Sequence, residues 1–72
     1  MTELVNHIVT ALVDNKDQVS VTEEGDVIVV KVAKEDMGKV IGKQGRNIKS
    51  IRSVVSAASK KIGRNYTVEI EE

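Results

Sequence analysis

The sequence predicts an α+β fold in which three helices pack on one face of a three-stranded mixed sheet. The spacing of the apolar residues alternates along the chain between a helical period and a strand period, in the order helix, strand, strand, helix, helix, strand. Two helices separate the second and third strands, and a helical crossover normally joins parallel strands with right-handed geometry. With 72 residues and no proline, repeat or low-complexity tract, the chain is expected to form one domain spanning residues 1–72.

The first predicted elements are a helix and a β-hairpin. Apolar residues recur at helical spacing over residues 4–12, and Thr2 precedes them as a candidate N-cap. A period of two begins at Val19, and Glu24-Gly25 offers a turn before a second strand over residues 27–33. This second strand is apolar on both faces, which is typical of a strand in the middle of a sheet, so we expect the first strand at an edge.

The remaining predicted elements are two helices and a final strand. A short helix begins at Glu35-Asp36, where acidic side chains suit the positive end of the helix dipole. Its buried side is expected to comprise Met37, Val40 and Ile41. A longer helix is predicted from roughly Arg46 to Lys61, with one apolar seam made of Ile48, Ile51, Val55, Ala58 and Ile62. Residues 66–71 alternate and form the last strand.

Charge is distributed unevenly along a chain whose formal net charge is zero. Residues 1–36 contain three basic and eight acidic side chains, whereas residues 37–72 contain eight basic and three acidic ones, so the halves have charges of −5 and +5. All eight cations of the second half lie within residues 37–64, where there is no acid. A polyanion responds to local charge, so this segment predicts a nucleic-acid partner.

The composition excludes several other classes of protein. There is no cysteine and a single histidine, His7, so no zinc site, cofactor or thiol chemistry is expected, and a reducing, cytoplasmic setting fits. The apolar stretch 4–13 is too short to cross a bilayer, which predicts no membrane partner. A phosphate loop needs four residues between its glycines and then Lys-Ser/Thr, but three residues separate Gly38 from Gly42 and neither Ser nor Thr follows Lys43. We predict no catalytic residue.

Two glycines three positions apart, Gly42 and Gly45, lie between the two predicted helices of the basic half. Glycine adopts backbone angles that other residues disfavour, and it lets another backbone approach closely. The helix that follows presents unpaired N–H groups at its start, and Lys43 and Arg46 add positive charge. The segment is therefore suited to hold a sugar-phosphate backbone.

The GxxG loop of KH domains, which holds about four nucleotides, resembles the segment Gly42-Lys43-Gln44-Gly45 with its flanks Val40-Ile41 and Arg46-Asn47-Ile48-Lys49-Ser50-Ile51. The order of elements is similar to that of the type II, or bacterial, KH domain. The length of the chain resembles that of the small single-domain proteins of the KhpA family. This resemblance covers essentially the whole chain. It implies a non-enzymatic protein that binds single-stranded RNA as an RNA chaperone or post-transcriptional regulator.

The family resemblance also implies partners and site residues. Its members form homodimers and pair with a larger protein that has Jag and KH domains, a pair linked to cell elongation, cell shape and division. By the same resemblance, the loop Gly42 to Gly45 would hold the RNA backbone. The apolar floor under the bases would consist of Val40, Ile41 and Ile48, with one of the first two partly exposed. The phosphate contacts would come from Lys39, Arg46, Lys49 and Arg52.

Other interpretations remain open from the residues alone. The glycines could form a plain turn between helices, and the basic helix face could be ordinary solvated surface. Tyr66 is the only aromatic residue, so stacking platforms of several rings are excluded, and we expect modest affinity with little sequence preference. The main alternative function is a dimerisation or docking module with weak RNA binding, and duplex DNA binding by the long helix ranks lower. His7 is expected to be solvated, and Val29 to lie on the uncovered face of the sheet.

Overall fold

The computed structural model describes residues 1–71 and confirms the α+β architecture and the order of elements. Glu72, the last residue of the expected domain, lies outside the described residues. The helices and strands are α1 (Thr2–Leu12), β1 (Ser20–Glu24), β2 (Val27–Lys31), α2 (Met37–Ile41), α3 (Arg46–Lys61) and β3 (Thr67–Glu71). Three short 3-10 turns connect them: η1 (Lys16–Gln18), η2 (Lys34–Asp36) and η3 (Lys43–Gly45).

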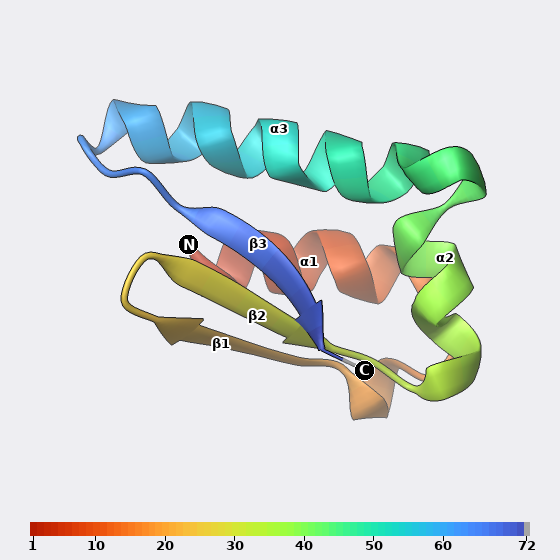
Figure 1. The fold of residues 1–72 in the computed structure, drawn as a ribbon. Coiled ribbons are helices and arrows are strands. Elements are labelled where there is room, and N and C mark those ends of the chain that lie inside the picture. Colours follow the sequence, from red (N-terminus) through yellow and green to blue (C-terminus); the bar gives the residue numbers. More distant parts are fainter. Residues whose placement is uncertain (72) are drawn as a thin grey trace.

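The sheet is mixed, with β2 in the middle as its two apolar faces predict. β1 and β2 are antiparallel, with Val21 opposite Val30, whereas β2 and β3 are parallel, with Ile28 opposite Val68. Figure 1 shows α1 and α3 along one face of the sheet, while α2 lies at the end where the chain leaves β2. Because α2 packs mainly against α3, the loop between these two helices lies beside the sheet end rather than over its centre.

The core lies between the sheet and α1 and α3. It is made of Val5, Val9, Val13, Ile28, Val30, Val32, Val40, Ile48, Ile51, Val55, Tyr66 and Val68. Valine dominates this list, and β-branched side chains pack well on a pleated surface. Tyr66 is the one ring in the core and is 6% exposed, so the chain's only aromatic side chain is largely withdrawn from solvent.

Two details of the sequence prediction are wrong at the helix ends. Thr2 is not an N-cap, because the Val5 N–H already donates to the Met1 carbonyl and makes Thr2 the first helical residue. Ile62 does not continue the apolar seam of α3, because the helix ends one residue before it and leaves it 60% exposed. Ser59 takes the buried position instead, and its hydroxyl donates to the Ser56 carbonyl at 3.0 Å.

The face of the sheet opposite the helices is polar. Val29 points to this face, where its cross-strand neighbours Thr22 and Glu69 leave it only partly exposed. None of the helices within residues 1–71 combines the length and the apolar character needed to cross a membrane.

Candidate nucleic-acid interface

The loop between α2 and α3 turns sharply through three residues with positive φ. These are Gly42 (φ 77°), Gln44 (φ 58°) and Gly45 (φ 75°). At Gly42 a side chain is excluded, because a Cβ atom would lie 2.7 Å from Cγ of Asn47 and 2.9 Å from its backbone nitrogen. At Gly45 only the backbone angle favours glycine, since the nearest atom to a Cβ there would be 3.9 Å away. Gly42 therefore provides the close approach, and Gly45 the left-handed turn into α3.

Three hydrogen bonds hold this loop in place. The Gly42 N–H donates to the Gly38 carbonyl at 2.8 Å, and the Gly45 N–H donates to the Gly42 carbonyl at 3.2 Å. Across the loop, the Asn47 side-chain amide donates to the Lys39 carbonyl at 2.8 Å and so joins the first turn of α3 to α2. Sequence reasoning quoted Asn47 only as a flank of the motif, although its position just after two glycines and its amide group fit this bridging role.

Lys43 and Gln44 form the exposed tip of the loop. Within residues 1–71, neither side chain has a hydrogen bond or an ion pair. Arg46 and Lys49, on the first turns of α3, are likewise exposed and unpaired in that part of the chain. The structure therefore brings four of the proposed RNA-contacting side chains together around the start of α3, where helix N–H groups also favour anions.

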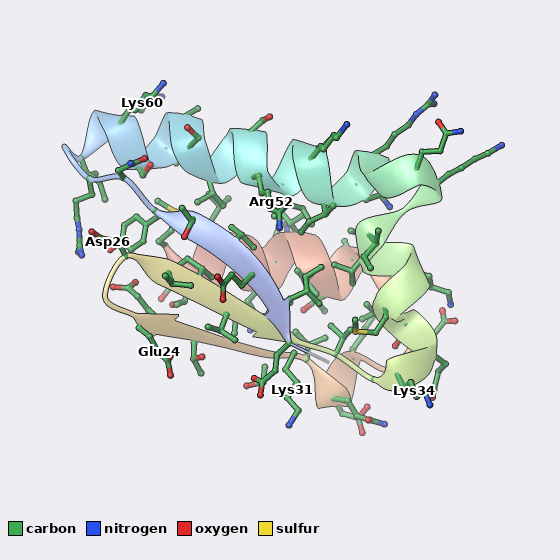
Figure 2. All side chains as sticks on the ribbon, viewed as in Figure 1. Glu24, Asp26, Lys31, Lys34, Arg52 and Lys60 are labelled. Atoms are coloured by element: carbon green, nitrogen blue, oxygen red, sulfur yellow. The ribbon has the colours of Figure 1, made fainter. Side chains whose placement is uncertain are left out.

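A groove with a volume of about 510 Å³ lies between α3 and β3, and it begins at Arg52, about two helical turns along α3 from the loop. Its walls are Arg52 and Ser56 of α3 and residues 65–69 on the β3 side. Arg52 points from α3 toward β3 (Figure 2), and its Nε–H donates to the Val68 carbonyl at 3.3 Å. Of these residues, sequence reasoning identified only Arg52, because nothing in the local pattern indicates which strand α3 will face.

Tyr66, which lines the end of the groove away from the loop, forms a polar cluster with Arg64 and two acids outside the groove. The Tyr66 hydroxyl donates to Glu23 at 3.1 Å, and burial together with this hydrogen bond raises the pKa of Tyr66 above its ordinary 10.0. The Arg64 guanidinium carbon lies 4.6 Å from the centre of the Tyr66 ring. It also donates to Asp26 at 2.7 Å, a hydrogen bond that raises the pKa of Arg64.

Lys39 differs from the other cations proposed to contact phosphate, because acids already surround its ammonium group. It forms an ion pair with Asp14, which raises the pKa of Lys39, and it lies 3.7 Å from Asp36. Asp36 is 1% exposed, and burial raises the pKa of its carboxyl group. Hydrogen bonds from the backbone and side chain of Asn15, both at 3.0 Å, and from the Asp14 N–H outweigh that effect, so the pKa of Asp36 is lowered overall.

The proposed apolar floor is mostly core. Val40 is fully buried and Ile48 is 8% exposed, whereas Ile41 is 38% exposed. Val40 cannot meet a ligand, because α2 packs this side chain against the core beneath the loop. Of the three residues, Ile41 alone offers substantial apolar surface next to the loop.

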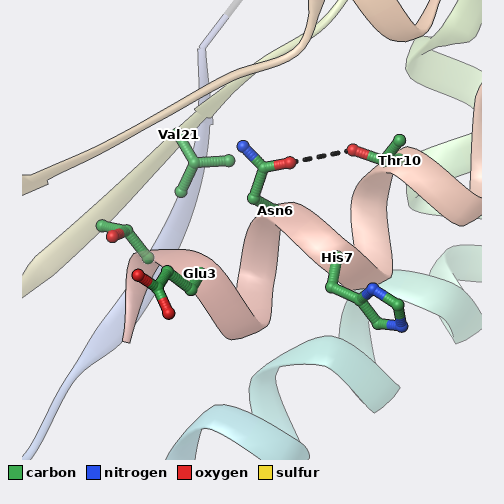
Figure 3. Close-up of a pocket in the computed structure, with 6 residues that line it drawn as sticks. Glu3, Asn6, His7, Thr10 and Val21 are labelled. Atoms are coloured by element: carbon green, nitrogen blue, oxygen red, sulfur yellow. Dashed lines mark hydrogen bonds between the residues drawn. The ribbon is translucent and has the colours of Figure 1, made fainter.

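A second, more open pocket of about 400 Å³ lies between α1 and β1. Figure 3 shows the side chains that line it, among them His7, Glu3 and Val21. The hydrogen bond drawn there joins the Thr10 hydroxyl to the Asn6 side chain, one turn apart on α1, at 2.9 Å. Within residues 1–71, no group of three His, Cys, Asp or Glu residues is placed to hold a metal ion.

Comparison with known proteins identifies a family. The family model described as KhpA/KhpB, KH domain, matches residues 2–70. RNA-binding protein KhpA of Caldanaerobacter subterraneus subsp. tengcongensis is 53% identical over 74 residues, covering 97% of this chain and 99% of that protein. The protein of the same name from Clostridium perfringens is 50% identical, with 97% and 99% covered. That of Listeria monocytogenes serovar 1/2a is 46% identical, and both chains are covered completely.

Proposed function

The chain belongs to the KhpA/KhpB family of KH domains, and from this membership and the loop geometry we propose that it binds single-stranded RNA without catalysing a reaction. The observation on which the proposal depends is the loop Gly42 to Gly45, whose backbone turns sharply at the start of α3 and exposes Lys43 and Gln44. The relatives named above all carry the name RNA-binding protein KhpA.

The RNA backbone would cross the loop, and the bases would enter the groove between α3 and β3. Lys43, Arg46 and Lys49 supply unpaired positive charge for phosphates at the loop end of this groove. Ile41 offers apolar contact there, and Arg52 lines the groove itself. Lys39 is a weaker candidate for a phosphate contact, because Asp14 and Asp36 already compensate its charge.

The family resemblance extends the proposal to partners and cellular role. We propose a cytoplasmic RNA chaperone or post-transcriptional regulator that forms homodimers and pairs with a larger Jag/KH-domain protein, with a role in cell elongation and cell shape. A mainly apolar hollow between α1 and α3, lined in part by Ile8, Leu12 and Val54, supports the presence of a protein contact surface. Two linked RNA grooves would also bind a long strand more tightly than one groove.

Fluorescence anisotropy with a labelled single-stranded RNA tests the RNA-binding proposal. The variant Lys43→Asp, Gln44→Asp places negative charge on the exposed loop tip and is expected to abolish binding while circular dichroism stays unchanged. For the wild type we expect a log-log salt slope of roughly −2 to −4, since each phosphate contact on a single strand contributes about −0.7.

A charge-matched control is Gln18→Asp, Lys34→Asp, which makes the same change in net charge at two exposed positions of η1 and η2, outside the loop and the groove. This control should retain most of the RNA affinity. If the loop variant binds RNA as well as the wild type does, or if the wild type does not bind, the chain acts instead as a docking module.

A further inference from the structure

Next to the end of the groove that lies away from the loop, the Arg64 side chain presents a flat cationic group that is restrained from two sides. The Arg64 guanidinium lies over the Tyr66 ring, with 4.6 Å between its central carbon and the ring centre. Its Nη2 donates to the Asp26 carboxylate at 2.7 Å. The ring beneath is also anchored, because its hydroxyl donates to Glu23 at 3.1 Å. These contacts restrain the orientation of the guanidinium plane over the ring.

One side of this guanidinium remains accessible. The Arg64 side chain is 46% exposed, whereas Tyr66 beneath it is 6% exposed. A base therefore cannot reach the ring itself, but it can reach the outer face of the guanidinium. Nucleobases stack on arginine guanidinium planes as well as on aromatic rings.

We propose that the outer face of the Arg64 guanidinium is a stacking platform for a nucleobase at the far end of the groove. Asn65 and Tyr66, which border Arg64 in sequence, both line the groove, so a strand that follows the groove arrives at this platform. The inference rests on the proposed RNA binding and adds a base contact that the loop motif does not include. It also explains how a chain with a single, buried ring can still stack a base.

The distance between the loop and Arg64 makes the platform selective for RNA length. The 16 residues of α3, at 1.5 Å each, separate the loop from the turn that carries Arg64 by about 24 Å. A loop of this kind holds about four nucleotides. A four-nucleotide RNA bound at the loop is therefore not expected to use Arg64, whereas an eight-nucleotide RNA is.

The proposal is tested by measuring how tightly the wild type and Arg64→Lys bind single-stranded RNAs of four and of eight nucleotides. Both RNAs have the same base composition. Lysine retains the charge, so the salt dependence of binding should be unchanged, but it lacks the planar guanidinium on which a base could stack. We expect Arg64→Lys to bind the eight-nucleotide RNA about tenfold more weakly and the four-nucleotide RNA within about twofold of the wild type. Lys49→Ala, which removes an exposed cation near the loop, is the control and should weaken binding of both RNAs by a similar factor.

A measurement on the wild type needs no substitution. The NMR signal of the Arg64 Nε–H should move upfield when the eight-nucleotide RNA saturates the protein, because a base stacked on the plane adds its ring current, and it should stay in place with the four-nucleotide RNA. The proposal of a stacking platform is wrong if this signal does not move at saturation, or if Arg64→Lys weakens the binding of both RNAs by the same factor. If the wild type binds neither RNA, the proposed function fails first, and the platform with it.

Discussion

Among the eight cations in the second half of the chain, the three around the loop have different surroundings from Lys39 and Arg64. Lys43, Arg46 and Lys49 lie around the loop, exposed and without an ion pair within residues 1–71. Lys39 and Arg64 instead contact carboxylates from the first half of the chain. Folding therefore neutralises part of the positive segment that stands out in the sequence. The unpaired cations around the loop indicate one place where an anionic ligand can bind, whereas Lys39 and Arg64 join the second half of the chain to the first.

The largest expected effect concerns the glycine that shapes the loop with the unpaired cations. Gly42→Ala would bring a Cβ atom to 2.7 Å from Asn47 and would also strain a backbone with φ of 77°. We expect it to lower the free energy of unfolding by about 3 kcal/mol. At roughly 4–8 °C per kcal/mol for a domain of this size, the thermal midpoint should fall by more than about 10 °C.

Gly45→Ala is the matched control for that measurement. Its φ is nearly the same at 75°, but its Cβ would meet nothing closer than 3.9 Å. The cost should be about 1 kcal/mol, from backbone strain alone. Equal midpoints for the two variants, read by calorimetry, would mean that the contact between Gly42 and Asn47 does not shape the loop.

A second prediction concerns the unpaired cations themselves. Arg46→Ala, Lys49→Ala removes two exposed charges near the loop, so the log-log salt slope of RNA binding should become less steep by about 1.4, and affinity at 0.15 M salt should fall roughly tenfold. The thermal midpoint should hardly change, because neither side chain is buried or paired in the described part of the chain. An unchanged slope would place the RNA path elsewhere.

The third prediction concerns Asp36, the buried acid next to the paired cation Lys39. The pKa of Asp36 is lower in the folded chain than its ordinary 3.8, since hydrogen bonds from Asn15 outweigh the effect of burial. Its stabilisation is therefore fully present above about pH 4 and is lost as pH falls through the folded-state pKa. Asp36→Asn should be less stable at pH 7, because an amide –NH₂ would face backbone N–H donors, and its urea midpoint should decline less steeply below pH 4.

Asp17→Asn is the comparison for that titration. Asp17 is exposed in η1, so the variant should have the wild-type urea midpoint at pH 7 and the wild-type decline of that midpoint below pH 4. If the urea midpoint of Asp36→Asn declines below pH 4 as steeply as that of the wild type, another carboxylate governs the loss of stability in acid.

The smallest expected effect tests the paired cation next to the loop. Lys39→Gln should leave the salt slope of RNA binding unchanged, because Asp14 and Asp36 already compensate this charge. The pKa of Lys39 is raised above 10.5, so the stability that its pairing contributes is present below that pH and is lost as pH rises further. Lys39→Gln should not show this loss of stability at alkaline pH. A slope reduced by about 0.7 would instead make Lys39 a phosphate ligand.

Much of the fold could be predicted because its signals are local. The bounds predicted for the long helix, roughly Arg46 to Lys61, agree with those of α3. The period of two and the turn at Gly25 predict the hairpin. The error at Ile62 has a local cause as well, since apolar spacing continues past the residue at which the helix ends.

The candidate site could be predicted only in part. The glycine spacing indicated the loop, but it did not indicate that Asn47 would bridge it or that Val40 would be buried beneath it. The groove was missed because its walls belong to α3 and β3, and the chain between them gives no local sign that they face each other. The pairing of Lys39 with Asp14, 25 residues away, was missed for the same reason.

The sequence by itself determined the order of helices and strands, the central position of β2 and the turn at Gly42 to Gly45. Each of these follows from the spacing of apolar side chains or from the backbone freedom of glycine, which act over a few neighbouring residues. Only the tertiary structure decided which cations remain unpaired, which apolar residues stay accessible and where the groove runs. These properties depend on residues far apart in the chain being brought together, because charge compensation and burial are set by neighbours in space.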